Sequence, residues 1–153
     1  MKIKIFLIFV PLIFLAAGCT QKAPETKISF GTGSVTINGH KLNVQIAETP
    51  QAQEKGLGGR NSLAENDAML FVFPEVGRMG FWMKDTLIPL DFIWIREGKI
   101  VEITPNVPTE PNVPDASLRT YAPEESIDST IEVNAGWTAK NNIKVGDEVT
   151  VIR

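Results

Sequence analysis

The chain has 153 residues, with 15 lysines and arginines against 18 aspartates and glutamates, and 43% of its residues are hydrophobic. This length predicts one domain rather than several. The chain contains one cysteine and one histidine, which excludes an internal disulfide bond and the Cys/His clusters of structural zinc sites. We therefore expect neither a cofactor nor a metal ion in this domain.

The first residues have the layout of a signal peptide. Lys2 and Lys4 precede the apolar run 5–15, and small residues then lead to Cys19. The apolar run is too short to cross a hydrocarbon core, which takes about 20 residues. The small residues before the cysteine resemble the lipobox of bacterial lipoproteins, although Ala16 stands where that pattern usually has leucine. The alternative is an ordinary secretory signal followed by an incidental thiol.

The lipobox resemblance implies cleavage after residue 18 and acylation of Cys19, with palmitate as a typical acyl group. Residues 19–27 then form a lipidated N-terminus and tether before a single domain over residues 28–153. The predicted location is the cell envelope, with the domain anchored to a membrane and facing outside the cytoplasm. Thr20 is not the acid that retains a lipoprotein in an inner membrane, so a bacterium with two membranes would carry the protein on the outer one.

Removal of the signal peptide changes the charge balance. Residues 1–18 contain two lysines and no acid, so the net charge changes from −3 to −5. An acidic chain without a basic tract is not expected to bind nucleic acid, because lysine and arginine must neutralise the phosphates.

Alternating polar and apolar residues dominate the first part of the mature chain and predict β-strands. The alternating segments are 27–30, 34–37 and 41–46. Asn38-Gly39 separates the last two segments and predicts a hairpin turn. The continuous apolar run 69–73 predicts a strand that is buried on both faces.

Four further strands are predicted over 91–95, 99–103, 130–133 and 148–152. Glu97-Gly98 predicts a hairpin between the first two of them. About seven short strands with little helix indicate a mainly β fold. We expect a compact antiparallel β-barrel or sandwich-like domain with one or two very short helices.

Two segments predict short helices and one predicts a loop. Thr49 and Pro50 supply an N-cap hydroxyl and a first helical proline before a stop at Gly56. The segment 136–141 could form one helical turn. The doubled Pro-Asn-Val-Pro of 105–114 cannot enter a sheet interior, so it predicts a loop rich in polyproline II conformation, either an ordinary surface excursion or a functional flap.

Five segments of the mature chain carry a family resemblance. They are Glu54-Lys-Gly-Leu-Gly-Gly-Arg60, Ala68-Met-Leu-Phe-Val-Phe-Pro74, Phe81-Trp-Met-Lys-Asp-Thr-Leu-Ile-Pro-Leu-Asp91, Ile131-Glu-Val-Asn-Ala-Gly136 and Ile143-Lys-Val-Gly-Asp147. Over about residues 35–152 the chain resembles the domain of unknown function 192 family. The resemblance implies an exported or membrane-anchored, compact β-rich domain and brings no established activity.

The chain departs from the family pattern at two positions. The family tends to have methionine where this chain has Gly58, and glycine where it has Ala68. If Gly58 faces a pocket, the missing thioether leaves room there.

The segment Phe81 to Thr86 is the densest cluster of unusual side chains. In a structural interpretation Phe81 and Met83 fill the core while Trp82 and Lys84 lie on the other face of a strand. In a functional interpretation Trp82 is a stacking platform, and Lys84 and Asp85 supply hydrogen bonds to a carbohydrate or peptide.

Arg60 and Asp91 are further candidates for ligand binding. Arg60 follows a glycine-rich bend and Asp91 follows Pro89-Leu90, so each side chain could be held rigidly. If the two meet, they form a buried bidentate pair that locks a loop onto the sheet. Alternatively, Arg60 is a receptor for a ligand carboxylate or phosphate.

Methionines and the histidine raise the possibility of Cu(I) binding, since thioether and imidazole ligands select this ion. The candidates are Met69, Met79, Met83 and His40, with Trp82 nearby. Methionine in a β core is more often a gap-filler. We therefore do not predict a metal site.

No catalytic residue is predicted. The chain has no Gly-x-Ser-x-Gly elbow and no His-Glu-x-x-His pair. Two carboxylates such as Asp85 and Asp91 could cleave a glycoside if the fold placed them suitably.

The function predicted from the sequence is that of a lipid-anchored extracytoplasmic domain that binds a ligand or an envelope partner. The expected partner is a glycan, a peptide or a protein, and the candidate binding residues are Arg60, Trp82, Met83, Lys84 and Asp91. The alternative is a cell-envelope enzyme that acts on polysaccharide through paired carboxylates.

Overall fold

The structure is a computed structural model that describes residues 28–153. The predicted signal peptide, Cys19 and the tether lie outside the described residues. The described part contains seven strands and two short α-helices. In chain order these are β1 Gly31–Ile37, β2 His40–Ala47, α1 Pro50–Lys55, β3 Asp67–Gly77, β4 Leu90–Arg96, β5 Lys99–Val107, β6 Ile127–Asn134, α2 Trp137–Lys140 and β7 Val149–Ile152. None of the helices in residues 28–153 is long and apolar enough to span a membrane.

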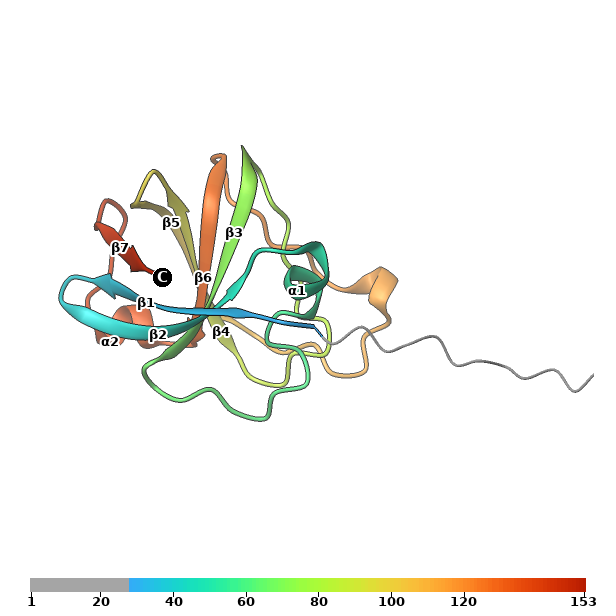
Figure 1. The fold of residues 1–153 in the computed structure, drawn as a ribbon. Coiled ribbons are helices and arrows are strands. Elements are labelled where there is room, and N and C mark those ends of the chain that lie inside the picture. The colour runs from blue at the N-terminus through green and yellow to red at the C-terminus, as the bar shows by residue number, and fades with distance from the viewer. Residues whose placement is uncertain (1–27) are drawn as a thin grey trace, which may run out of the picture.

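The seven strands form one curled sheet with the order β5-β4-β6-β3-β2-β1-β7 (Figure 1). The two ends of the sheet approach each other, because Lys99 at the start of β5 pairs with Glu148 just before β7. The mainly β, barrel-like fold with very short helices is thus confirmed. The sheet is not wholly antiparallel, however, since β2 and β3 run parallel.

Both predicted hairpins are present, and their turns explain the residues found there. Asn38 and Gly39 have φ angles of 48° and 80°, and Glu97 and Gly98 have φ angles of 51° and 70°. Two consecutive residues with positive φ form the type I′ turn, which matches the twist of the flanking strands and favours glycine at its second position. The first turn joins β1 to β2 and the second joins β4 to β5.

Helix α1 begins and ends as predicted. The hydroxyl of Thr49 accepts a hydrogen bond from the Ala52 N–H at 3.2 Å, and Pro50 occupies the first turn, where no backbone donor is needed. Gly56 ends the helix with a φ angle of 44°. The predicted helical turn near residue 136 is also present, as α2.

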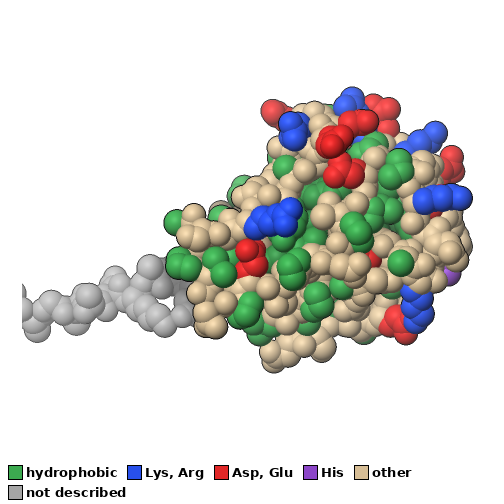
Figure 2. All heavy atoms as spheres, turned by 180° about the vertical axis from the view of Figure 1, so that it is seen from behind, with side chains coloured by type: hydrophobic (Ala, Val, Ile, Leu, Met, Phe, Trp, Pro, Cys, Tyr) green, Lys and Arg blue, Asp and Glu red, His purple; other side chains and the backbone are tan. Residues whose placement is uncertain are grey.

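Buried hydrophobic residues form two clusters, one on each face of the central strands. In β3, Leu70 belongs to the cluster that β1, β2 and β7 enclose, whereas Met69 and Phe71 belong to the cluster beneath α1 and the long loops. The prediction that the run 69–73 is covered on both faces is confirmed for residues 69–71, which are all buried. On the outer surface opposite the view of Figure 1, exposed hydrophobic side chains lie among polar ones (Figure 2).

Three local predictions need correction. Residues 28–30 are not in a strand, so the first strand starts at Gly31 instead of Lys27. The proline-rich segment is not a loop throughout, because β5 continues through Pro105 to Val107. This is tolerated because β5 is an edge strand and the pairing between β4 and β5 is irregular there, so the missing N–H costs no regular ladder bond.

The third correction concerns the segment around Trp82. The predicted alternation of burial is present, since Met83 is buried and Trp82 is 44% exposed. The segment is nevertheless not a strand. Its one sheet-like contact is an isolated bridge between Phe81 and Tyr121.

Candidate functional site

A cavity of about 380 Å³ lies between α1, β3 and the loop that carries Phe81 and Trp82. We call it the aromatic pocket. Its lining residues come from α1 and the two residues after it, from β3, from the loop and from β6. They are Gln53, Glu54, Lys55, Gly56, Leu57, Phe71, Phe73, Pro74, Met79, Gly80, Phe81, Trp82, Lys84, Thr86 and Glu132.

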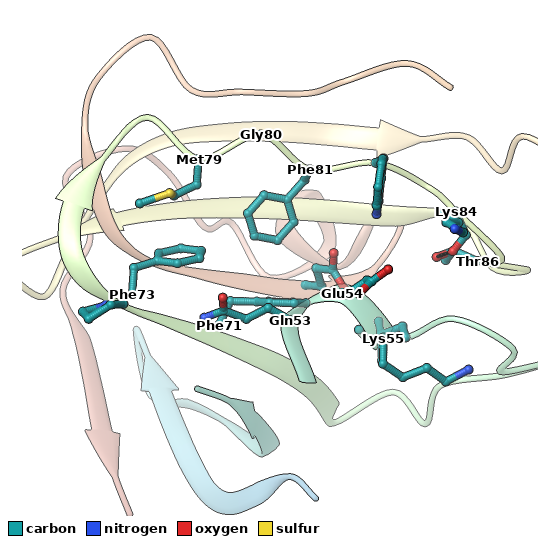
Figure 3. Close-up of a pocket in the computed structure, with 15 residues that line it drawn as sticks. Gln53, Glu54, Lys55, Phe71, Phe73, Met79, Gly80, Phe81, Lys84 and Thr86 are labelled. Carbon is teal, nitrogen blue, oxygen red and sulfur yellow. Dashed lines mark hydrogen bonds between the residues drawn. The ribbon is translucent and has the colours of Figure 1, made fainter. Parts of the chain in front are cut away.

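Phenylalanine rings form the wall of this pocket. The ring centroid of Phe81 lies 4.9 Å from that of Phe71 and 6.1 Å from that of Phe73, and both pairs are edge to face. Figure 3 shows Phe81 directed from its loop toward the two β3 rings, with Met79 near Phe73 at one end and Lys55 and Lys84 at the other. A cavity with one apolar end and one charged end favours a ligand of matching polarity.

Backbone hydrogen bonds hold the loop over the sheet. Phe81 and Tyr121 exchange N–H···O bonds of 2.7 and 2.8 Å, and the Gly59 N–H donates to the Asp85 carbonyl at 2.8 Å. The second bond joins the segment after α1 to the loop. The loop that carries the aromatic wall and helix α1 are therefore held in fixed positions relative to each other. The pocket is thus formed before a ligand binds.

Glu132 brings a carboxyl group to the pocket from the middle of the sheet. In the strand register it pairs with Met69 of β3 and Phe92 of β4, both of which are completely buried. Glu132 itself is 5% exposed. Among residues 28–153 no side chain or backbone group forms a hydrogen bond with its carboxyl, although the carboxyl lies in reach of the pocket. A buried acid that opens onto a cavity marks a candidate binding site.

Burial raises the pKa of Glu132 to about 8, and the positive charge of Arg60 opposes this rise. The carboxyl is therefore mostly protonated at neutral pH. In that state it can both donate and accept a hydrogen bond, and it offers both to any group that enters the pocket.

Two other polar side chains of the pocket already have partners. Gln53 donates to the carbonyls of Val72 at 2.9 Å and Ala47 at 3.4 Å. The Thr86 hydroxyl donates to the Lys84 carbonyl at 3.3 Å. Among the described residues, Glu132 is thus the buried side chain of the pocket whose hydrogen-bonding capacity is free, whereas Glu54 and Lys55 line the pocket as exposed residues.

Lys84 and Trp82 stand at the mouth. The Lys84 ammonium lies 2.6 Å from an Asp115 carboxylate oxygen and 5.7 Å from the Trp82 ring centroid. The hydrogen bond and charge of Asp115 raise the pKa of Lys84. Lys84 is therefore positioned over the indole ring, and the predicted stacking residue remains 44% exposed.

A second cavity of about 370 Å³ adjoins the first. Three residues, Glu54, Lys55 and Lys84, line both cavities. We call the second one the polar cavity, because its remaining lining residues are mostly polar or small. These are Ile28, Gln51, Gly58 and Asp85. Gly58 thus lines a cavity, as the sequence led us to consider.

Arg60 and Asp91 do not meet. The Arg60 guanidinium donates to the Gln45 side chain, and Gln45 lies in the same row across the sheet as Met69 and Glu132. Asp91 points to the opposite face of the sheet, because it alternates with Phe92 along β4. Arg60 therefore contributes positive charge near Glu132, and the Arg60–Asp91 pair that the sequence offered as one alternative is absent from residues 28–153.

Asp91 is fully buried and its hydrogen bonds join β4 to two other segments. Its carboxylate accepts from the backbone N–H of Asn106 at 2.8 Å, Gly136 at 3.0 Å and Thr138 at 3.0 Å. The Thr138 hydroxyl donates a fourth bond of 2.6 Å. These bonds fix the start of α2 and the irregular part of β5. The role of Asp91 is therefore structural. Asp91 also cannot form a catalytic pair with Asp85, which lines the polar cavity on the other side.

Met83 lies in the core cluster beneath the pocket and lines neither cavity. Met69 is buried in the same cluster, whereas Met79 lines the aromatic pocket. His40 packs edge to face against Trp137, 6.2 Å between ring centroids. The described residues contain no group of three or more His, Cys, Asp and Glu side chains that could hold a metal ion.

Comparison with known proteins places the chain in a family. The model of the domain of unknown function 192 (DUF192) family, described as "Uncharacterized ACR", matches residues 33–151. The chain belongs to the DUF192 family. None of the curated proteins compared with it matches.

Two solved structures resemble this DUF192 domain. One is a candidate transcription regulator from Sinorhizobium meliloti 1021, with 27% identity and a TM-score of 0.73, covering 82% of this chain and 98% of that one. The other is a protein of unknown function from Novosphingobium aromaticivorans DSM 12444, with 27% identity and a TM-score of 0.68, covering 79% of this chain and 84% of that one.

Sequence reasoning missed Glu132 as a site residue. Glu132 alternates with Ile131 and Val133, which is typical of a strand with one solvated face. The neighbouring strand β3 indicated the opposite for Glu132, because the apolar run 69–73 predicts that this part of the sheet is buried on both faces. An acid in a strand beside that run would be buried, but the sequence does not show which strands are neighbours.

Proposed function

We propose that this DUF192 domain is a ligand-binding module of the cell envelope. The observation that carries the proposal is the aromatic pocket with the carboxyl of Glu132, a buried residue that has no hydrogen-bond partner among residues 28–153. Its ligand has an apolar or aromatic body that packs against the phenylalanine wall and one polar group that reaches Glu132. A volume of about 380 Å³ is at the lower end of the range for small-ligand sites, about 300 to 1,000 Å³.

We further propose that acylated Cys19 anchors the module to a membrane, on its extracytoplasmic side. The support is the lipobox-like sequence before Cys19. The described domain begins at residue 28, so about nine residues would separate it from the anchor. An extended chain of this length spans at most about 30 Å, which keeps the pocket near the membrane surface.

Ligand binding can be tested by thermal unfolding of the purified chain in the presence of envelope glycans, peptides, anions and metal ions. A ligand at 100 times its dissociation constant stabilises the native state by about 2.7 kcal/mol. Trp82→Ala should reduce the stabilisation because Trp82 lines the pocket. Leu87→Ala is the matched control, since Leu87 is 55% exposed on the same loop and does not line the pocket.

The proposal is refuted if no compound of these classes shifts the unfolding temperature. It is also refuted if the shift is the same in both variants and in the wild type, because the ligand would then bind elsewhere.

The second candidate function is an envelope enzyme that acts on polysaccharide. The observation in its favour is that Glu54 and Glu132 line one pocket, and a protonated carboxyl beside a second carboxylate is the usual arrangement of glycosidases. Incubation with labelled envelope polysaccharide tests it. Release of fragments by the wild type but not by Glu132→Gln would establish the enzyme, and no release by either would exclude it for that substrate.

A further inference from the structure

We infer that the ligand of the aromatic pocket is a peptide segment that inserts a tyrosine side chain beside Glu132 and lays its backbone across Glu54 and Lys55 into the polar cavity. This inference rests on the proposed function and names the ligand class. It follows from which hydrogen-bonding groups are free in each cavity and from the residues that the two cavities share.

The free groups of the aromatic pocket match a phenol. Its walls are the rings of Phe71, Phe73 and Phe81, and Glu132 is its buried polar side chain left without a partner among the described residues. An aromatic ring with one terminal hydroxyl would place the ring in edge-to-face contact with the wall and the hydroxyl at the carboxyl. An ammonium group is less suitable, because the nearby Arg60 already supplies a positive charge.

An oligosaccharide fits the aromatic pocket poorly. Each sugar ring carries several hydroxyls, and burying a hydroxyl without a hydrogen bond costs about 1 to 3 kcal/mol in proteins. Gln53 and Thr86 already bond to backbone carbonyls. Because Glu54 and Lys55 are exposed, the buried part of the pocket offers only Glu132 among the described residues, which is too few partners for a sugar ring but enough for a single phenol.

The polar cavity differs from the aromatic pocket in having no aromatic lining residue. Within residues 28–153, no hydrogen bond or ion pair occupies the side chains of Gln51, Glu54, Lys55 or Asp85. These groups provide both donors and acceptors, which is what an extended peptide backbone requires at successive residues. Lys84 is held by Asp115 and is left out of this set.

The shared residues make the two cavities one elongated site. Glu54 and Lys55 belong to α1 and line both cavities. A ligand long enough to occupy both must cross them. A single amino acid fills the aromatic pocket alone, whereas a peptide of several residues reaches both cavities, so peptide length is the variable to test.

The test uses calorimetric titration of the full chain in detergent with four probes. These are N-acetyl-tyrosinamide, acetyl-Ala-Ala-Tyr-Ala-Ala-amide, the same peptide with phenylalanine in place of tyrosine, and chitotetraose. We expect the tyrosine pentapeptide to bind at least about tenfold more tightly than N-acetyl-tyrosinamide. We expect it to bind about two- to tenfold more tightly than the phenylalanine pentapeptide, through one hydrogen bond.

Two variants separate the parts of the inference. Glu132→Met removes the hydrogen-bonding group and keeps a side chain of similar length, so the preference for tyrosine over phenylalanine should disappear while phenylalanine binding persists. The double variant Gln51→Ala, Asp85→Asn alters the polar cavity alone. It should weaken the pentapeptide toward the affinity of N-acetyl-tyrosinamide and leave the latter unchanged. Asparagine suits position 85, where φ is 54°.

Several results would overturn the inference. If N-acetyl-tyrosinamide and the pentapeptide bind equally well, the ligand does not extend into the polar cavity, although the proposed binding function stands. If chitotetraose binds more tightly than the pentapeptides, the ligand is a glycan. If Glu132→Met keeps the tyrosine preference, Glu132 does not recognise the hydroxyl. Failure of both pentapeptides to bind at millimolar concentration also overturns the inference, while another ligand from the unfolding screen would still support the proposed function.

Discussion

Replacing Glu132 by glutamine should stabilise the domain increasingly as the pH rises. Glutamine keeps the shape of the protonated acid and cannot ionise. In the wild type, burial raises the pKa of Glu132 from its ordinary value of 4.5 to about 8. Between these two values the folded state holds a proton that the unfolded state has released, so the wild type loses stability as the pH rises through this window.

The magnitude follows from the width of the window. Each pH unit within it changes the free energy of unfolding by about 1.4 kcal/mol. From pH 5 to pH 7 the wild type should therefore lose about 2 to 3 kcal/mol relative to Glu132→Gln. Above pH 8 the carboxyl ionises in both states and the loss levels off, so a further change of only about 1 to 2 kcal/mol is expected by pH 9.

Urea unfolding at pH 5, 7 and 9 measures this difference. Other groups titrate as well, but their contributions cancel when the variant is subtracted from the wild type at each pH. Glu125→Gln is the matched control, since Glu125 is exposed and does not line the pocket. A difference between wild type and Glu132→Gln that is constant from pH 5 to pH 9 would refute the reasoning, because Glu132 would then be ionised in the folded state as in the unfolded one.

Three further substitutions give distinct expectations. Asp91→Ala should lower the free energy of unfolding by about 3 to 5 kcal/mol in denaturant titrations, because four donors lose their acceptor in the interior; a loss under about 1 kcal/mol would contradict this role. Thr130→Val should stabilise the domain by about 1 kcal/mol, since the buried hydroxyl has no hydrogen-bond partner among the described residues; destabilisation would indicate an unrecognised partner. Cys19→Ser should release the protein from the membrane fraction or stall its precursor. Unchanged fractionation would contradict the proposed lipid anchor.

Local signals in the sequence predicted the elements of this fold well. The turns at Asn38-Gly39 and Glu97-Gly98 require positive φ angles that few residues adopt, and the Thr49-Pro50 start of α1 depends on capping chemistry within four residues. Each of these signals acts between near neighbours in the chain. For that reason the sequence alone was enough to place them.

The site depends instead on contacts between distant segments. Glu132 is buried because β6 lies between β3 and β4, and its row partners Met69 and Phe92 are far from it in sequence. The sequence allowed Arg60 and Asp91 to meet. Side chains alternate between the two faces along β4, however, and Asp91 lies on the face opposite Phe92 and Glu132. Trp82 and Lys84 were recognised by residue type alone, and the structure places both at the aromatic pocket.

The most direct test of ligand binding in the aromatic pocket is a backbone amide NMR titration with N-acetyl-tyrosinamide. We predict that the largest chemical-shift changes occur at Phe71, at residues 80–82 and at Glu132, which all line the pocket. We also predict that Trp82→Ala weakens the response. Changes confined to other parts of the domain, such as the exposed end of β7, or no changes at millimolar concentration, would contradict the account.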